Sequence, residues 1–290
     1  MNEILRCPVC GRTLPLRPPC ECGFLLRESD GILDLLTPAE GAADEPFLAA
    51  YERVRAAEGW GGDDLDLPFH PKRHADIWAI RQRSFLKLET LVRGNASGFA
   101  LDIGAGNCWL TKHLDEWGFD AFAVDINVSV ADGLKTGQFY LDRGARFLRV
   151  RAGMERLPFV DAGIQLIVAN ASFHYASDFR AVIFEFHRVL DPAGRIVIID
   201  TPFYLSESDG ERMVCERVEQ FRRSYGIGEA LARRSGYMTR ERLDESVRGL
   251  DMQYEMHSIP TGLRRTYEKW RSCLLGRRIA EFPMVVLHRS

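Results

Sequence analysis

Residues Phe99–Asp125, FALDIGAGNCWLTKHLDEWGFDAFAVD, decide the fold. An apolar run from Phe99 to Ile103 ends in Gly104-Ala105-Gly106, a helical pattern follows, and a second apolar run ends in Asp125. This order of strand, glycine turn, helix, strand and acidic residue is typical of a nucleotide-binding βαβ unit. Glycines let the backbone approach a ligand closely, and a helix N-terminus presents free N–H groups. A carboxylate at Asp125 can accept hydrogen bonds from both hydroxyls of a ribose.

Two residues of this unit distinguish between nucleotides. A dinucleotide fingerprint requires a third glycine three residues after Gly106, where this chain has the bulky Trp109. Asp102, just before the glycine turn, would repel phosphates but attract an ammonium or sulfonium group. S-adenosylmethionine, an adenosine with a cationic amino-acid tail, therefore fits best. A glycine turn in an ordinary α/β protein and a nicotinamide dehydrogenase are the alternatives, and Trp109 and Asp102 disfavour the second.

Over about residues 95–205 the chain resembles the class I S-adenosylmethionine-dependent methyltransferases. The resemblance implies that LDIGAGN, residues 101–107, is the methionine-binding turn and that Asp125 holds the ribose. It also implies that Met154–Asp178 contains a loop that covers adenine and a strand that ends at the active-site mouth. The family often has an acid where this chain has Gly153, so we expect adenine to be recognised by backbone around Met154 and Glu155. The expected cofactor-binding residues are Arg81, Asp102, Gly104, Ala105, Gly106, Asn107, Asp125, Ile126, Met154, Glu155 and Asn170.

Arg81 lies on the apolar stripe of a predicted helix, Ala75–Val92. An arginine at such a position usually extends to the edge of the core. The alternative is that it meets a carboxylate, either that of the cofactor or that of Asp102.

Four of the seven cysteines lie close together, as Cys7-x-x-Cys10-Gly11 and Cys20-x-Cys22-Gly23. Four thiolates at this spacing suit tetrahedral zinc, and the following glycines permit tight turns. A pair of disulfides is the alternative, which a cytoplasmic location would disfavour. Asp30-Gly31 predicts a hairpin that closes a zinc ribbon over residues 1–36, to which the metal would supply folding energy.

This N-terminal segment resembles the zinc ribbons of large-subunit rRNA guanine-N1 methyltransferases and of small subunits that activate some eukaryotic methyltransferases. The module is short and common, so it does not transfer a substrate.

The chain has 290 residues and a formal net charge of −3, so nothing global indicates a polyanionic partner. The charge is uneven, because residues 211–290 carry 16 Arg and Lys against 11 acids. No run of 18 apolar residues exists, which predicts no membrane span. The start, MNEILRCPVC, lacks the apolar stretch of a signal peptide, and we expect a cytoplasmic protein. The sequence does not predict the oligomeric state.

Polar and aromatic residues follow two predicted strands, Gln165–Ala169 and Arg195–Asp200. Ligands of open α/β sheets bind beyond the carboxyl ends of strands. The expected catalytic residues are His174, Tyr175 and Tyr204. His174 is either a general base or a histidine that only shapes the pocket.

The predicted fold is α/β, with a seven-stranded, doubly wound, Rossmann-like methyltransferase sheet and the small N-terminal zinc ribbon. Residues 37–93 form a helical connector with a cofactor-covering loop, and residues 94–290 form the methyltransferase domain. A helical lid is expected over about 206–250. The other expected elements are helices at Pro46–Ala57, Phe179–Leu190 and Arg264–Ile279, and last strands at Met252–Ile259 and Met284–Arg289.

The sequence thus predicts an S-adenosylmethionine-dependent methyltransferase. The near-neutral charge and the aromatic residues around the lid favour a small or conjugated metabolite as substrate. RNA, such as an rRNA base, is the alternative, supported by the ribbon and the basic C-terminal part. A non-catalytic adaptor that only binds the cofactor and a partner is another, which the intact glycine turn and Asp125 disfavour.

Overall fold

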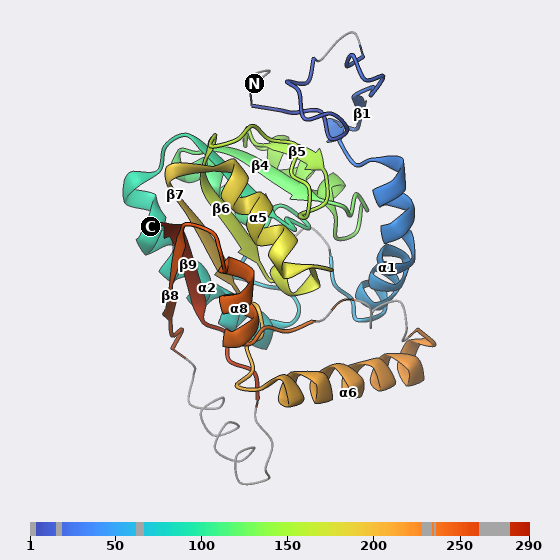
Figure 1. Cartoon of the computed structure of the whole chain (residues 1–290). Helices are drawn as coiled ribbons and strands as arrows, with labels where there is room; N and C mark the ends of the chain where they lie inside the picture. The colour runs from blue at the N-terminus through green and yellow to red at the C-terminus, as the bar shows by residue number, and fades with distance from the viewer. Residues whose placement is uncertain (1–3, 16–18, 62–66, 228–233, 235, 261–278) are drawn as a thin grey trace.

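In the computed structural model, nine strands form one mixed sheet in the order β1-β2-β5-β4-β3-β6-β7-β9-β8 (Figure 1). The described residues are 4–15, 19–61, 67–227, 234, 236–260 and 279–290. The strands are β1 (Arg27–Ser29), β2 (Ile32–Asp34), β3 (Phe99–Ile103), β4 (Asp120–Asp125), β5 (Leu148–Arg151), β6 (Ile164–Asn170), β7 (Leu190–Ile199), β8 (Met252–His257) and β9 (Met284–Arg289).

The five central strands, β5-β4-β3-β6-β7, run parallel, and β9 joins β7 antiparallel. Strand order reverses between β3 and β6, which is the topological switch point where such sheets bind ligands. The predicted strands are all present, and β7 begins at Leu190 rather than at Arg195.

The expected count of seven strands is wrong because the hairpin β1–β2 joins the sheet. The predicted turn Asp30-Gly31 is there, but β2 pairs parallel to β5, with Ile32 opposite Arg149. The guanidinium of Arg149 is buried and donates to the backbone oxygen of Asp30 (2.6 Å) and to Gln138 (2.7 Å). A buried cation of the central sheet thus holds the turn of the hairpin.

Helices cover both faces of the sheet (Figure 1). They are α1 (Pro38–Ala57), α2 (Ala75–Val92), α3 (Trp109–Trp117), α4 (Gln138–Leu141), α5 (Phe179–Val189), α6 (Glu207–Tyr225) and α8 (Arg240–Val247), with 3-10 turns at Arg93–Asn95, Leu134–Gly137 and Phe173–Tyr175. Alternate residues of each strand face opposite cores: Leu101 and Ile103 pack with α5 and α8, whereas Ala100 packs with α2, α3 and α4. The first helix starts at Pro38, earlier than the expected Pro46, because Thr37 and Glu40 form a capping box there.

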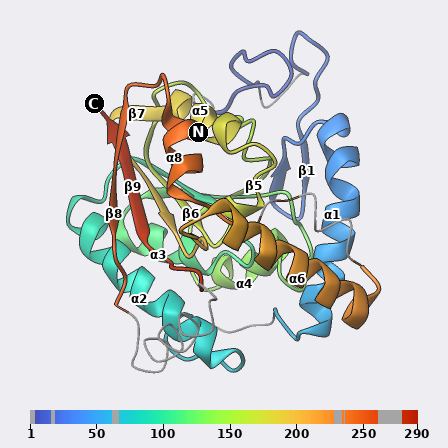
Figure 2. The same cartoon turned by 60° about the horizontal axis from the view of Figure 1, so that its bottom comes forward.

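The region expected to be a lid separates into two parts. Helix α6 lies apart from the sheet at its carboxyl edge, and its end meets the end of α1, where Tyr225 donates to Glu58 at 3.4 Å (Figures 1 and 2). Helix α8 instead packs against α5, and its Leu243 is fully buried. Of the two helices described in this region, α6 is the one that lies at the carboxyl edge of the sheet. The helix expected at Arg264–Ile279 falls on residues 261–278, outside the described part of the chain.

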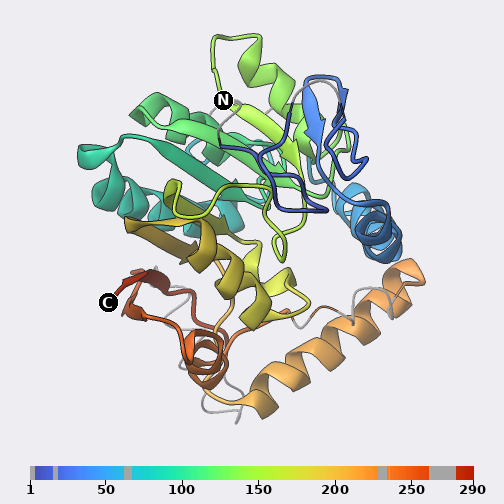
Figure 3. The same ribbon diagram turned by 45° about the horizontal axis from the view of Figure 1, so that its top comes forward.

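The cysteine segment packs on the central domain, above the sheet (Figure 3). Leu5 forms an antiparallel bridge with Phe159, and Arg6 N donates to Pro158 O at 2.9 Å. Ile4, Leu5 and Leu14 are buried in the same core as α5. Within the described residues, no helix combines the length and the apolar composition needed to cross a membrane.

Candidate functional site

Three cavities meet at the switch point, beyond the carboxyl ends of β3, β4, β6 and β7. Tyr51 of α1 and Ala171, just after β6, line all three. The cavities are therefore branches of one site. We call them the Asp125 arm, the Trp60 arm and the α6 chamber, each after a residue or helix that lines it.

The Asp125 arm lies over the end of β4, with α1 forming its other wall. Of the residues predicted to bind the cofactor, it brings together Asp125, Ile126, Met154 and Glu155. Glu155 Oε1 already accepts hydrogen bonds from the backbone and hydroxyl of Ser177, at 2.9 and 2.8 Å. The expectation that backbone, rather than this carboxylate, faces a ligand here is consistent with that arrangement.

The glycine turn is held from both sides. Gly104 N donates to Val124 O at 2.8 Å, and Gly106 N donates to Asp125 Oδ2 at 2.8 Å. Gly104 has a φ of 69°, and a Cβ there would lie 2.3 Å from the Cβ of Ser172. Only glycine fits this position, because any side chain would be strained and would collide with the residue after β6.

Asp125 is oriented by the turns on either side of it. Its second oxygen, Oδ1, accepts from Asn127 N at 2.8 Å. Burial raises the pKa of Asp125 to about 6, against the lowering effect of these backbone N–H groups. A carboxylate has about four acceptor positions, so two remain for the hydroxyls of a ligand.

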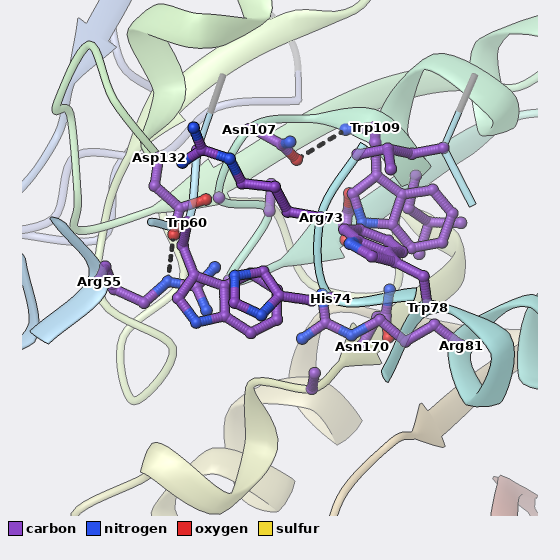
Figure 4. Close-up of a pocket in the computed structure, with 18 of the residues that line it drawn as sticks. Arg55, Trp60, Arg73, His74, Trp78, Arg81, Asn107, Trp109, Asp132 and Asn170 are labelled. Atoms are coloured by element: carbon purple, nitrogen blue, oxygen red, sulfur yellow. Dashed lines mark hydrogen bonds and ion pairs between the residues drawn. The ribbon is translucent and has the colours of Figure 1, made fainter. Parts of the chain in front are cut away.

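The Trp60 arm leads from the glycine turn toward α2 (Figure 4). It brings together the remaining residues predicted to bind the cofactor: Arg81, Asp102, Gly104, Ala105, Gly106, Asn107 and Asn170. Asp102 is 1% exposed and accepts from Thr111 Oγ1 at 2.6 Å. Burial raises the pKa of Asp102 to about 7. A cation bound in this arm would favour the ionised form of Asp102 and would be stabilised by its negative charge.

Arginines and indoles make up the wall of the Trp60 arm (Figure 4). Trp60 stacks on His74 with ring centroids 3.8 Å apart, and the guanidinium of Arg55 lies 4.0 Å from the Trp60 ring. Arg55 is paired with Asp132 at 2.5 Å. Arg81 lies 4.8 Å from the ring of Trp78 and has no carboxylate within ion-pairing distance among the described residues. Arg81 thus packs on aromatic rings beside the site and does not pair with Asp102, and a contact with the carboxylate of the cofactor stays a prediction.

The α6 chamber is a cavity of about 470 Å³ between α1, α2, α6 and the ends of β6 and β7. All three residues predicted to be catalytic, His174, Tyr175 and Tyr204, line it. His174 is 6% exposed, and its Nδ1 has no hydrogen-bond partner in the described part of the protein. Burial, followed by the charges of Arg217 and Arg81, lowers the pKa of His174 to about 3, so the imidazole is neutral. Tyr175 packs between the rings of Tyr51 (5.8 Å) and His174 (4.3 Å).

The charged residues of the site that were not predicted from the sequence include Asp132, Asp200, Arg217 and Arg234. Asp200 directly follows β7, a position that already points to this edge of the sheet. Arg217 interrupts the apolar face of α6, a pattern that could have identified it. Arg234 pairs with Asp44 and lies 4.8 Å from the ring of Phe47. No local sequence signal identifies that role, because both partners lie in α1, far away in the chain.

The four N-terminal cysteines form a cluster apart from this cavity. All four Sγ atoms lie within 4.8 Å of one another, and Cys7–Cys22 and Cys10–Cys20 are each 3.5 Å apart. The glycines act as expected, since Gly11 N donates to Cys7 O and Gly23 N to Cys20 O. Four thiolates at this separation fit a tetrahedral ion, because sulfurs about 2.3 Å from zinc lie just under 4 Å apart.

Comparison with known proteins agrees with the site. Residues 101–198 match the model of a family described as "Methyltransferase domain". These residues run from β3 into β7. Over this span the chain is similar to that family, and the span lies on the Rossmann-like α/β sheet described above.

Two curated relatives are malonyl-[acyl-carrier protein] O-methyltransferase 1 of Coxiella burnetii and glycine/sarcosine/dimethylglycine N-methyltransferase of Actinopolyspora halophila. They are 28% and 23% identical over 56% and 60% of this chain. The chain spans about half of the first relative (52%) and a third of the second (31%).

A solved structure, geranyl diphosphate C-methyltransferase from Streptomyces coelicolor, superimposes with a TM-score of 0.50 at 15% identity. The superposition covers 87% of this chain and 97% of the chain of the Streptomyces enzyme. At this low sequence identity, the comparison shows a shared fold.

Proposed function

We propose that this protein is an S-adenosylmethionine-dependent methyltransferase that acts on a small molecule. The observation that carries the proposal is the branched cavity, in which two arms meet at the glycine turn and both open onto a third, larger chamber. Two arms joined at the turn suit a ligand with two unlike ends, and the chamber suits an acceptor beside their junction.

The cofactor's adenosine would occupy the Asp125 arm and its amino-acid part the Trp60 arm. Asp125 would accept hydrogen bonds from the ribose hydroxyls, and Ile126, Met154 and Glu155 would surround the base. Asp102 and Asn170, whose Oδ1 is buried without a partner in the described residues, would face the cationic amino-acid part. The backbone of Gly104–Asn107 and the guanidinium of Arg81 would take its carboxylate. When bound, the cofactor supplies an electrophilic methyl group.

The residues of the α6 chamber would hold the acceptor in line with that methyl group. The rings of Tyr51, Tyr175 and Tyr204 orient it and exclude water, which supports transfer by alignment and desolvation. The neutral imidazole of His174 accepts or donates one hydrogen bond at Nδ1, according to its tautomer. With a pKa lowered to about 3, it is a weak general base, and we assign it to positioning the nucleophile.

A small molecule is favoured over RNA because α6 and α1 meet over the chamber, which limits it to about 470 Å³. The names of the curated relatives also point to acceptors other than RNA and to enzymes rather than adaptors. The RNA and adaptor hypotheses are therefore not favoured. A cytoplasmic location remains a prediction.

The direct test is calorimetric titration with S-adenosylhomocysteine, followed by incubation with methyl-labelled cofactor and fractionated cell extract. We expect micromolar binding of one molecule per chain and label in a low-molecular-weight fraction. No binding of the cofactor product would refute the proposal, and label in rRNA would replace the small-molecule acceptor with RNA.

We also propose a structural zinc ion held by Cys7, Cys10, Cys20 and Cys22, within a segment that includes residues 1–36. The fit of the four sulfurs supports it, and the metal would fix two tight turns that pack on the core. Metal analysis of protein purified under reducing conditions without chelator should find one zinc per chain, and the Cys20→Ser variant should lose it. An apo wild-type protein that is fully folded would contradict this site.

A further inference from the structure

Four arginines and the carboxylates of Glu58 and Asp200 line the α6 chamber. Arg55 is paired with Asp132, and Arg234 is paired with Asp44 and Glu155. The remaining two, Arg81 and Arg217, have no carboxylate within ion-pairing distance among the described residues.

Arg217 is the more informative of the two, because it borders the α6 chamber and neither arm. It projects from the face of α6 that also carries Met213, Val214 and Phe221 toward the chamber. The other arginines of that helix have partners on the helix itself, Arg212 with Asp209, and both Arg222 and Arg223 with Glu219. The guanidinium of Arg217 is half-buried and lies 6.0 Å from the ring of Phe221, but it has no ion-pair partner among the described residues, and an unpaired charge on an apolar face is costly unless something else neutralises it.

Two buried polar atoms that lack a hydrogen-bond partner in the described residues lie near Arg81 or Arg217. His174, whose Nδ1 is buried and unpaired, is close enough to Arg217 and Arg81 for both to act on its pKa. Asp200 at the end of β7 is buried, with Oδ1 bound to Ser84 at 2.6 Å and Oδ2 unpaired in the described part of the chain. Burial lowers the pKa of Arg81, and the charge of Asp200 opposes that lowering, so Asp200 acts on this guanidinium.

We infer that the acceptor is an organic monoanion with an apolar body, whose carboxylate binds Arg217 beside His174. This inference rests on the proposed function and specifies the substrate class of the same site.

Charge and shape both favour this class over a phosphate. Because Arg81 is assigned to the cofactor's carboxylate, Arg217 is the guanidinium left for the acceptor, and one guanidinium suits one carboxylate. Glu58 and Asp200, which also line the chamber, disfavour a dianion. Asp200 would repel a second negative charge and instead favours an N–H or O–H donor on the acceptor. The apolar part would lie along Ile77, Ile80, Val214 and Phe221, which line the same space.

The test uses the full chain saturated with S-adenosylhomocysteine and matched pairs of probes, hexanoate with hexanamide and 3-phenylpropionate with 3-phenylpropionamide. The two members of each pair have the same hydrocarbon skeleton and differ in charge. Binding can be followed by the fluorescence of Trp60, which borders the chamber, and by calorimetry. We expect each acid to bind about 10- to 100-fold more tightly than its amide, as expected for charge-assisted hydrogen bonds.

The variants locate that preference. Arg217→Gln should remove the difference between acid and amide, and Arg217→Lys should keep part of it. Arg223→Gln, an exposed arginine of the same helix, is the matched control and should retain the full preference. Phenyl phosphate should bind no better than 3-phenylpropionate.

The outcomes separate the two proposals. Failure of the wild type to bind S-adenosylhomocysteine would refute the proposed function itself. Normal binding of S-adenosylhomocysteine without discrimination between acid and amide, or a full preference in Arg217→Gln, would overturn the monoanion acceptor alone. Tighter binding of phenyl phosphate would also overturn it.

Discussion

The two arms share a wall built from β3, β4 and the turns that directly follow them, whereas the α6 chamber is lined by α1, α2, α6 and the ends of β6 and β7. In the arms, backbone N–H groups fix the decisive carboxylate, as Gly106 and Asn127 do for Asp125. In the chamber, side chains from distant helices meet, and two buried polar atoms, His174 Nδ1 and Asp200 Oδ2, lack a partner within the described residues. The first region is set by local geometry, and the second is completed only by tertiary packing and by a bound molecule.

The largest effect that sharpens this comparison is expected from Leu243 of α8. Leu243→Ala should lower the free energy of unfolding by about 2–5 kcal/mol, because the side chain is fully buried in the core beneath α5. Urea denaturation measures it. A change below 1 kcal/mol would instead place α8 with α6, as part of a loosely attached lid.

Asp125→Ala should weaken S-adenosylmethionine binding by about 2–3 kcal/mol, since charge-assisted hydrogen bonds are lost from a desolvated site. The substitution should change the free energy of unfolding less than the free energy of cofactor binding, because the partners of Asp125 are backbone groups at the surface of the cavity. Calorimetry on the wild type, Asp125→Ala and Asp125→Asn tests this. Unchanged affinity would remove Asp125 from the cofactor site.

Lower pH should have opposite effects on cofactor affinity and on stability. The pKa values of Asp102 and Asp125 are raised to about 7 and about 6, so both carboxyls become protonated as the pH falls from 8 to 5. S-adenosylmethionine affinity should then fall, by up to about tenfold for each carboxyl that loses its charge.

The folded ligand-free protein binds protons more tightly at these carboxyls than the unfolded chain does. Their contribution to the free energy of unfolding therefore increases as the pH falls over the same range. Calorimetric titrations and thermal unfolding in the same buffers test both trends, with Asp102→Asn as the control that lacks the upper step. Parallel trends would contradict the assignment.

The smallest effect is expected at the contact between the ends of α1 and α6. Tyr225→Phe removes a 3.4 Å hydrogen bond to Glu58 near the surface and should change the free energy of unfolding by less than about 0.5 kcal/mol. Thermal unfolding measures it. A loss above 1 kcal/mol would mean that α6 is as firmly attached as the helices that cover the sheet.

The glycine turn and Asp125 could be identified from the sequence because the information that brings them together is local. Gly104, Gly106 and Asp125 lie within 22 residues, and the spacing of strand, turn and helix determines where they meet. The central strands were predicted for the same reason, since their apolar runs are continuous and bounded by turn residues.

What the sequence does not predict depends on pairing between distant segments. The turn of the β1–β2 hairpin was identified, but its place beside β5 is set by Arg149, more than a hundred residues away. Arg217 and Asp200 reach the same chamber from a helix and a strand end, and neither has a motif. A polar residue on an apolar helix face indicates a function only once the opposite wall is known.

The sharing of Tyr51 and Ala171 by all three branches has a kinetic consequence. A molecule in the arms forms part of the wall of the chamber, because Arg55, Trp60 and Arg81 border both spaces. The two ligands should then be thermodynamically linked, each raising the affinity for the other by the same factor. Steady-state kinetics would show this as an apparent KM for each ligand that falls as the concentration of the other ligand rises.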